Sequence, residues 1–375
     1  RPESREATTP TILGLHRHLA GERQPARNKN MKQKTAVLMS GGVDSSVAAL
    51  LLRDRGYNVF GLTILQYECD PSDSQVGKAQ SVAHLLGLEH HTLALSQFFR
   101  EAVIEPFLEA YRAGRTPNPC FRCNPRLKFG KCFEIARQMG AECIASGHYA
   151  RILSTDSGWR LGRAMDPSKD QSYFLAGVPG GMLKNILFPN GELTKEQVRQ
   201  IAREHSLPGA DTEESQEICF TPGGDVHAFL EGQLEEHEGD IVDGSGAVLG
   251  CHRGIVHYTV GQRKGLGLAG GPYYVRALDA ARNQVLVGRY EELLARRVYA
   301  VEANFFAPLV QGTDGQAKIR SRHTAAPCTV IQATGETFAV EFAEPQWGVA
   351  PGQALVLYHG DIILAGGVID RWDPA

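Results

Sequence analysis

The chain has 375 residues with 39 basic and 42 acidic side chains, which gives a formal net charge of −3. This length allows about two or three domains, each with an apolar core. Because the charges nearly balance, no general basic field indicates a nucleic-acid partner, and any RNA binding must come from local patches. No apolar run reaches the ~20 residues that a membrane helix needs, so we expect no membrane partner.

The eight cysteines occur without a secretory signal. This predicts a reducing, cytoplasmic location, where cysteines serve catalysis or metal binding more often than disulfides. Residues 1–30 differ from the rest because they are rich in arginine and proline, and Met31 looks like a natural start. The acids Glu3, Glu6 and Glu22 argue against an organelle-transit peptide, so we expect a disordered or extraneous leader.

Strand-like and helix-like segments alternate over the next part of the chain. Strands are expected at 35–39, 58–64, 89–95 and 142–145, and helices at 45–55, 76–86, 97–113 and 126–139. Such alternation is typical of a parallel sheet with helices on both faces. Ligands of these sheets bind at the carboxyl ends of the strands, so the loops that begin at Ser40 and Ser146 are expected to meet in one crevice.

The loop 40–46, Ser-Gly-Gly-Val-Asp-Ser-Ser, joins the first strand to the first helix. Its glycines let the backbone turn tightly and present N–H groups to an anion at the helix N-terminus. The loop lacks the Gly-Lys-Ser/Thr ending of a Walker loop and resembles the SGG-x-DS signature of the ATP pyrophosphatases, the PP-loop enzymes. That resemblance implies that the loop holds the pyrophosphate of ATP and that Asp44 helps to hold Mg²⁺. A plain Gly-Ser turn is the alternative.

Two further zones follow. After about residue 151 the pattern changes to short strands and loops with one clear helix at 194–205, whose Thr194 and Gln197 predict a capping box. After Gly271, short β-branched segments punctuated by Gly or Pro predict a small all-β barrel. The predicted fold is α/β, with a PP-loop domain of the adenine nucleotide alpha hydrolase type at 31–190, a small central domain at 191–270 and a C-terminal all-β barrel at 271–375.

The segment 115–124, Arg-Thr-Pro-Asn-Pro-Cys-Phe-Arg-Cys-Asn, presents a pair of thiols. Its two prolines exclude a helix and predict a rigid, extended loop. Basic residues that follow, Lys128 among them, are expected to favour the thiolates of Cys120 and Cys123. A zinc site would want four ligands and usually a second Cys-x-x-Cys, which the chain lacks.

The remaining cysteines divide into two groups. Cys219 follows an acidic run, begins a Thr-Pro-Gly-Gly loop and is unremarkable by itself. The others are expected to be small apolar filler; they are Cys69, Cys132, Cys143, Cys251 and Cys328.

A series of motifs in order, taken together, resembles the tRNA-specific 2-thiouridylase family. They are the loop 40–46, the segment 116–124, the pair Lys128 and Phe129, and the segments 146–151, 169–175, 215–220 and 252–267. The resemblance covers about residues 34 to 370. These bacterial and organellar enzymes place sulfur on C2 of the wobble uridine in the anticodon loop of tRNA. The resemblance implies that ATP adenylates the C2 oxygen, after which a sulfur nucleophile displaces AMP.

The resemblance also implies roles for single residues. Cys219 would carry the incoming sulfur as a persulfide from a sulfur-relay protein or a cysteine desulfurase, and Cys123 would attack it, closing a transient disulfide between the two. The implied ATP contacts are Leu38, Met39, Ser40, Gly41, Gly42, Val43, Asp44, Ser45, Ile64 and Gly147. The implied contacts with the flipped target base are Asn118, Pro119 and Cys120. Other tRNA contacts are His148, Lys169, Asp170, Gln171, Arg320, Ser321 and Gln353.

Two departures from the family pattern matter. Members often have aspartate where this chain has Cys120, so a general-base role at that position does not carry over. Cys120, Cys123 and Cys219 could instead ligate a 4Fe-4S cluster and leave one iron open for sulfide. A cluster-dependent mechanism is therefore an alternative to the persulfide route. The stretch 65–73 is also shorter than in many relatives and lacks their Asn-Trp. This departure affects the segment that the resemblance places on the adenine side of the pocket.

Two other functions stay open at this point. A different PP-loop enzyme, such as an amidating ligase, would share the Ser40 loop without needing distant paired cysteines. A metal-stapled tRNA-binding protein would hold zinc tightly and cleave no ATP. Conversion of ATP to AMP and pyrophosphate in the presence of tRNA separates the three.

Overall fold

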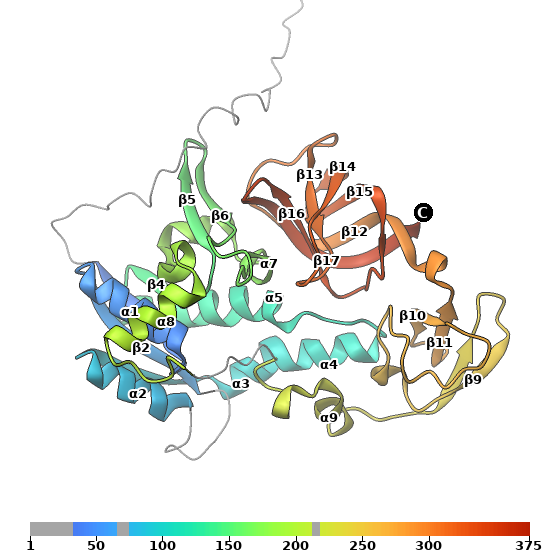
Figure 1. The fold of residues 1–375 in the computed structure, drawn as a ribbon, viewed down its shortest axis with the longest axis horizontal. Coiled ribbons are helices and arrows are strands. Elements are labelled where there is room, and N and C mark those ends of the chain that lie inside the picture. Colours follow the sequence, from blue (N-terminus) through green and yellow to red (C-terminus); the bar gives the residue numbers. More distant parts are fainter. Residues whose placement is uncertain (1–32, 66–74, 212–217) are drawn as a thin grey trace, which may run out of the picture.

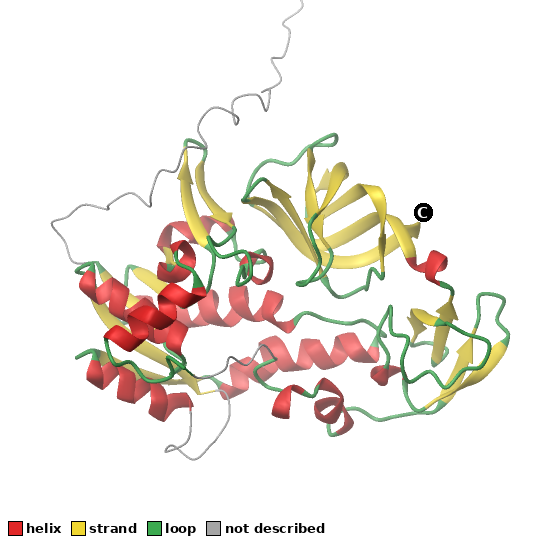
Figure 2. Ribbon diagram, viewed as in Figure 1, coloured by secondary structure: helices red, strands yellow, loops and turns green. Residues whose placement is uncertain are grey.

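A computed structural model describes residues 33–65, 75–211 and 218–375. The predicted leader at 1–30, Cys69 and most of the shortened stretch 65–73 lie outside these ranges. Within them, helices and strands form an α/β layer, a small central sheet and a barrel (Figures 1 and 2). The predicted α/β fold class with a C-terminal barrel is confirmed.

A parallel sheet forms the N-terminal part of the molecule, as predicted. Its strand order is β3-β2-β1-β4-β7, with β1 (Lys34–Leu38), β2 (Asn58–Leu65), β3 (Glu89–Ala94), β4 (Cys143–Ser146) and β7 (Ile186–Leu187). All residues of β4 are buried, and so are all but the first residue of β1. Central parallel strands are covered on both faces, which explains why these segments are continuous apolar runs.

Helices connect these strands and cover the sheet (Figure 1). They are α1 (Val43–Asp54), α2 (Gln75–Leu85), α3 (Ser96–Phe99), α4 (Glu105–Arg112), α5 (Pro119–Cys123), α6 (Cys132–Gln138), α7 (Ser172–Leu175) and α8 (Lys195–Glu204). Two π-helical stretches, η2 (Arg100–Ile104) and η3 (Asn124–Lys131), make α3 continuous with α4 and α5 continuous with α6. π-Helical turns are rare and often occur at functional sites.

The predicted extended loop at 115–124 is wrong in its second half, because α5 begins at Pro119. Proline is allowed at the first position of a helix, where its missing N–H would have had no partner and its fixed φ suits the helix. Asn118 caps the helix, and its side chain accepts a hydrogen bond from the Phe121 backbone N–H at 3.3 Å. The thiol pair is therefore presented by a helical turn.

The central sheet has the order β10-β11-β8-β9. Its strands are β8 (Gly239–Val242), β9 (Val248–His252), β10 (Tyr274–Asp279) and β11 (Gln284–Gly288), and α9 (Val226–Glu231) precedes them. β11 pairs in parallel with β8. The boundary proposed at 270/271 thus falls between strands of one sheet.

The C-terminal strands close into an antiparallel barrel in the order β12-β15-β14-β13-β16-β17, and β12 pairs with β17. Its strands are β12 (Leu294–Phe305), β13 (Asp314–Lys318), β14 (Ala326–Thr334), β15 (Thr337–Trp347), β16 (Ala354–His359) and β17 (Ile362–Pro374). Val298, Val330 and Leu355 are fully buried in its core. Closure removes the exposed edges that an open sheet would leave.

Short elements join these parts. The hairpin of β5 (Arg151–Thr155) and β6 (Gly158–Gly162) extends the barrel sheet, because Gly162 pairs with Ile362. The 3-10 helices are η4 (Gly180–Asn185), η5 (Pro189–Glu192), η6 (Pro222–Gly224), η7 (Ile255–His257) and η8 (Tyr290–Leu293).

The barrel is fastened to the segment that precedes and includes α5. Arg115 forms an ion pair with Asp370 at 2.8 Å, and Arg122 donates to both carboxylate oxygens of Glu302 at 3.0 Å. The side chain of Gln353 donates to the carbonyl oxygen of Thr116 at 3.0 Å. Barrel residues therefore hold the segment that leads into the helical turn of Cys120 and Cys123.

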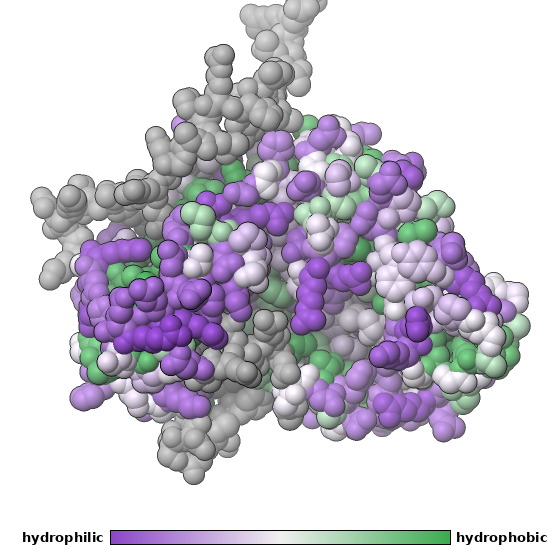
Figure 3. Space-filling model, in the orientation of Figure 1, coloured by the Kyte–Doolittle hydropathy of each residue, from purple (hydrophilic) through white to green (hydrophobic). Residues whose placement is uncertain are grey.

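The face drawn in Figure 3 is mostly hydrophilic, with small hydrophobic patches between the polar residues. In the part of the chain that the structure describes, no helix is both long and apolar enough to cross a bilayer.

The capping box predicted at Thr194 is confirmed: its hydroxyl accepts from the Gln197 N–H at 3.2 Å, and Gln197 accepts from the Thr194 N–H at 2.8 Å. We expect Thr194→Ala to lower the opening free energy of α8 by about 1 kcal/mol, because the Gln197 N–H in the first turn loses its side-chain acceptor. Native-state hydrogen exchange of the α8 amides measures this value. The exposed Gln200→Ala should change it by less than about 0.5 kcal/mol; equal effects would contradict the capping role.

Candidate active site

The loop between β1 and α1 is a tight backbone cradle. Gly41 has φ +72°, a left-handed conformation in which a Cβ would also collide with Lys78. The Ser45 hydroxyl donates to the Gly42 carbonyl at 2.9 Å and accepts from the Ser40 N–H at 3.1 Å. These bonds fix the loop at the N-terminus of α1, where N–H groups and the helix dipole favour an anion.

The loop after β4 packs directly on this cradle. A Cβ at Gly147 would lie 2.6 Å from the Asp44 carbonyl carbon and 2.7 Å from the Ser45 nitrogen, so only glycine fits. The Asn190 side chain donates to the carbonyl oxygens of Asp44 (2.9 Å) and Gly147 (3.2 Å) and joins the two loops. The crevice expected from the strand order is therefore present.

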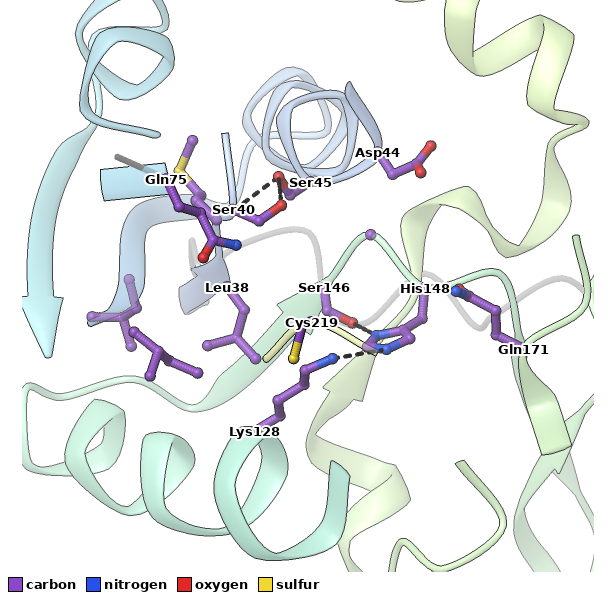
Figure 4. A pocket seen from close by; sticks show the side chains of 14 residues that line it. Leu38, Ser40, Asp44, Ser45, Gln75, Lys128, Ser146, His148, Gln171 and Cys219 are labelled. Atoms are coloured by element: carbon purple, nitrogen blue, oxygen red, sulfur yellow. Dashed lines mark hydrogen bonds between the residues drawn. The ribbon is translucent and has the colours of Figure 1, made fainter. Parts of the chain in front are cut away.

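A cavity of about 260 Å³ lies between these loops and α2, η3 and the segment around Cys219 (Figure 4). Of the positions expected to contact ATP, those that line it are Leu38, Met39, Ser40, Asp44, Ser45, Ile64 and Gly147. Gly41, Gly42 and Val43 shape the loop behind it. Lining residues that were not expected as contacts are Leu62, Gln75, Lys128 and Ser146. Lys128 could have been found, since it belongs to one of the ordered motifs.

Asp44 is engaged by two side chains from other parts of the chain. Lys195 Nζ lies 2.7 and 2.9 Å from its two carboxylate oxygens, and the Tyr149 hydroxyl donates to it at 2.6 Å. Burial lowers the pKa of Lys195, an effect that Asp44 opposes. Burial and then the Asp44 charge raise the pKa of Tyr149. Lys195, at the first turn of α8, was missed because nothing in its local sequence links it to the Ser40 loop.

This arrangement bears on the Mg²⁺ ligand expected at Asp44. Mg²⁺ needs carboxylate oxygens that are open to it and to its waters. Both oxygens of Asp44 contact Lys195, whose side chain is only 9% exposed. As placed, these residues do not fit a magnesium ion at Asp44, and no chemical step is derived through it.

The thiols of Cys120 and Cys123 lie one turn apart on α5, and neither residue lines the cavity. Burial raises the pKa of Cys123 to about 12; Lys128 opposes this effect, while Cys219 and Cys120 add to it. Burial raises the pKa of Cys120 as well. The expectation that nearby positive charge favours thiolates is therefore wrong for this pair, because loss of hydration outweighs the attraction of Lys128.

Cys219 differs from this pair because it is exposed and lines the cavity from the segment between α8 and α9. Cys123 and Cys219 are both thiols in the structure. A single zinc ion would draw thiol sulfurs to within about 4 Å of one another, given Zn–S bonds near 2.3 Å. Among the described residues, the three thiols do not form a group of ligand atoms within 4.8 Å. A zinc staple at this place is not supported.

The filler cysteines are mostly as expected. Cys132, Cys143 and Cys328 are buried, but Cys251 is exposed, so the expectation is wrong there. Alternation along the edge strand β9 turns the Cys251 side chain away from the core.

His148 lies at the inner wall of the cavity between two polar side chains (Figure 4). Its Nδ1 is 2.7 Å from the Ser146 hydroxyl and its Nε2 is 3.3 Å from Lys128 Nζ. Burial, with Lys128 adding to it, holds the pKa of His148 well below its usual range. The imidazole is neutral, so Nε2 accepts from Lys128 and Nδ1–H donates to Ser146.

The positions expected to contact tRNA fall into two places. Gln171 lines the cavity and accepts from the Tyr149 N–H at 2.9 Å. Asp170 is only 7% exposed, and it accepts from the backbone N–H groups of Ala164 and Ser172. Lys169 lies in the same turn. Arg320 and Ser321 follow β13 on the barrel, where Arg320 is exposed. Contact with tRNA stays a prediction for all of these.

Three family models match the chain in order. They are a tRNA methyl transferase HUP domain at residues 33–223, a tRNA methyl transferase PRC-barrel domain at 227–289 and an aminomethyltransferase beta-barrel domain at 295–369. The tRNA-specific 2-thiouridylase MnmA of Geobacter metallireducens is 43% identical over 360 residues, which cover 90% of this chain and 97% of that protein. The tRNA-specific 2-thiouridylase MnmA 1 of Syntrophus aciditrophicus is 43% identical over 351 residues, which cover 91% of this chain and 94% of that protein.

The first match includes the parallel sheet and both loops of the cavity, so the protein is an α/β protein of the HUP class with a phosphate-type loop. The identity to curated relatives extends over nine-tenths of the chain. The chain belongs to the tRNA-specific 2-thiouridylase family, and the resemblance drawn from the ordered motifs is confirmed.

The thiols should differ in reactivity. We expect iodoacetamide near neutral pH to alkylate the exposed Cys219 and Cys251 in the native protein, while the buried Cys123 and Cys132 stay unmodified because burial limits access and raises their pKa. Peptide mass spectrometry after timed quenching measures this order. Unfolding in urea should make all of them react, and early labelling of Cys123 in the native protein would contradict the burial of this thiol.

Proposed function

We propose that the protein is an ATP-dependent tRNA 2-thiouridylase that replaces the C2 oxygen of the wobble uridine with sulfur, giving 2-thiouridine, AMP and pyrophosphate. The observation that carries the proposal is that the phosphate-type loop and the Cys219 thiol face the same cavity (Figure 4). A nucleotide and a sulfur carrier can thus act on one atom. Relatives at 43% identity carry the name tRNA-specific 2-thiouridylase.

In the first step, the C2 oxygen of uridine attacks the α-phosphate of ATP and pyrophosphate leaves. The backbone N–H groups of loop 40–46 would hold the departing pyrophosphate at the start of α1. Asn118, Pro119 and Cys120 would receive the flipped base, since C2 is hard to reach in a stacked anticodon. Lys169, Arg320 and Ser321 would contact the tRNA backbone, the last two from the C-terminal barrel formed by β12 to β17.

Sulfur can be delivered by either of two routes, and an observation supports each. The exposure of Cys219 supports a persulfide there, because a sulfur-relay protein or cysteine desulfurase can reach it. Cys123 would then attack the Cys219 sulfur, forming a transient disulfide and releasing hydrosulfide. These reduced thiols suit the cytoplasmic location that we predict.

The second route uses a 4Fe-4S cluster. Cys120 and Cys123 on one turn of α5, together with Cys219, would hold it, and the group would supply an iron open for sulfide. Thiol donors of this kind fit such a cluster, whose ligand sulfurs sit on different irons and so lie farther apart than around one zinc ion. Cys120, where relatives often have aspartate, supports this route.

The overall reaction is tested with purified protein, ATP, tRNA and a sulfur donor. We expect AMP and pyrophosphate to form only with tRNA, and nucleoside analysis to detect 2-thiouridine. Asp44→Ala should abolish thiolation and leave tRNA binding nearly unchanged, because the phosphate loop and the exposed Arg320 lie on different parts of the fold. An equal loss of both, with a lowered melting temperature, would mean that Asp44 supports the fold through Lys195. Absence of ATP cleavage in the unmodified protein would contradict the function itself.

The two sulfur routes separate at Cys120. Cys123→Ser and Cys219→Ser should stop thiolation in both routes while pyrophosphate release survives, because adenylation needs no thiol. Cys120→Asp should keep activity in the persulfide route and weaken iron binding in the cluster route, since carboxylate is a poorer partner for iron than thiolate. Anaerobic purification with iron and sulfide analysis gives the readout. Full turnover by iron-free protein with a persulfide donor would exclude the cluster.

A further inference from the structure

Lys128 is a cation of the cavity that has no part in the steps above. It lies half-buried on η3 and lines the same cavity as Cys219 (Figure 4). It also acts on the two buried thiols, since it opposes the effect of burial on the pKa of Cys120 and Cys123. Lys128 therefore shares the cavity with the loop 40–46 and Cys219 and influences the other two thiols.

The anchor of Lys128 is a neutral acceptor. Its Nζ donates to His148 Nε2 at 3.3 Å, and the far side of that ring donates to Ser146 at 2.7 Å. Phe129 and Phe188 lie against the imidazole, with ring centroids 6.0 Å from it in each case. Among the described residues, Lys128 forms no ion pair with a carboxylate, in contrast to Lys195, which pairs with Asp44, and Lys131 on the same helix. No carboxylate of the described ranges therefore neutralises the ammonium that His148 holds in place.

We propose that Lys128 is a catalytic residue of the sulfur step, in which its ammonium binds the anionic sulfur that attacks C2, and that His148 is the residue that positions it. The inference rests on the proposed function and adds to it the group that compensates the charge of the attacking sulfur. It holds for either route of sulfur delivery, because both present an anionic sulfur in this cavity.

Atoms and charge are conserved when hydrosulfide replaces AMP at C2. Adenylation leaves C2 bonded to the oxygen of AMP and doubly bonded to N3, whose proton has been lost. Hydrosulfide forms the C2–S bond, and the C2–O bond breaks with its electron pair leaving on AMP. The sulfur proton then moves to N3, which gives the thiocarbonyl of 2-thiouridine. Negative charge is present on sulfur at the start and on AMP at the end, and Lys128 faces it throughout.

A fixed donor aimed at a developing anion typically contributes a factor of 10²–10³ to the rate. Lys128→Met keeps the length of the side chain and removes its charge, whereas Lys128→Arg keeps the charge. Lys131→Met is the matched control, because Lys131 lies on the same helix and pairs with Glu134 on the surface at 3.1 Å.

The experiment uses the full chain with tRNA, ATP and sodium sulfide as the sulfur source, under anaerobic conditions. Pyrophosphate released in the first turnover reports adenylation, and 2-thiouridine reports the sulfur step. For Lys128→Met we expect thiolation to fall about 100-fold and the KM for sulfide to rise, while first-turnover pyrophosphate changes little. Lys128→Arg should recover most of the thiolation, and Lys131→Met should behave as the unmodified protein.

Several results would overturn the inference. Parallel losses of pyrophosphate release and thiolation in Lys128→Met would assign the residue to the ATP step. Unchanged thiolation would remove it from the chemistry. A lowered melting temperature or lost tRNA binding in both Lys128 variants would make its role structural. If the unmodified protein releases no pyrophosphate with tRNA, the proposed function itself fails, which is distinct from a defect confined to the Lys128 variants.

Discussion

The close approach of Gly147 to the first turn of α1 governs the geometry of the cavity. Because no Cβ separates the two backbones, the loop after β4 touches the carbonyl of Asp44, and Asn190 ties both loops together. Ser146 and His148, on either side of Gly147, are thereby set at a fixed depth. His148 in turn fixes Lys128. One glycine contact thus places the loop 40–46 and the Lys128 ammonium in a common frame.

Burial, rather than charge, sets the chemical state of the residues around that frame. The Cys123 thiol has its pKa raised to about 12 although Lys128 lies nearby, and the imidazole of His148 stays neutral for the same reason. Loss of hydration disfavours whichever form is charged. Cys219 is exposed whereas Cys123 is buried, so the fold puts these two thiols in different surroundings.

Much of this was readable in the sequence, for identifiable reasons. The central strands β1 and β4 are almost wholly buried, so their apolar runs predicted them closely, and the glycines of loop 40–46 predicted a tight turn before a helix. The prediction was wrong where a sequence pattern is compatible with two structures. Pro119 is compatible with both an extended loop and the first position of a helix, and the residues after it decided for the helix. The Asp44–Lys195 pair joins positions 151 residues apart, and no local pattern carries such a contact.

The fastening between the barrel and the α/β part has a consequence for how the chain can be divided. The Asn304 side chain donates to the carbonyls of Ala176 and Val178 at 2.9 and 2.8 Å, and the Gln353 side chain donates to that of Thr116. Tyr173 is fully buried and bonds to the backbone of Ala354. An excised N-terminal half would leave these acceptors and this aromatic ring without cover. The barrel therefore covers part of the α/β half, and removing the barrel would expose polar and aromatic groups around the helix that carries Cys120 and Cys123.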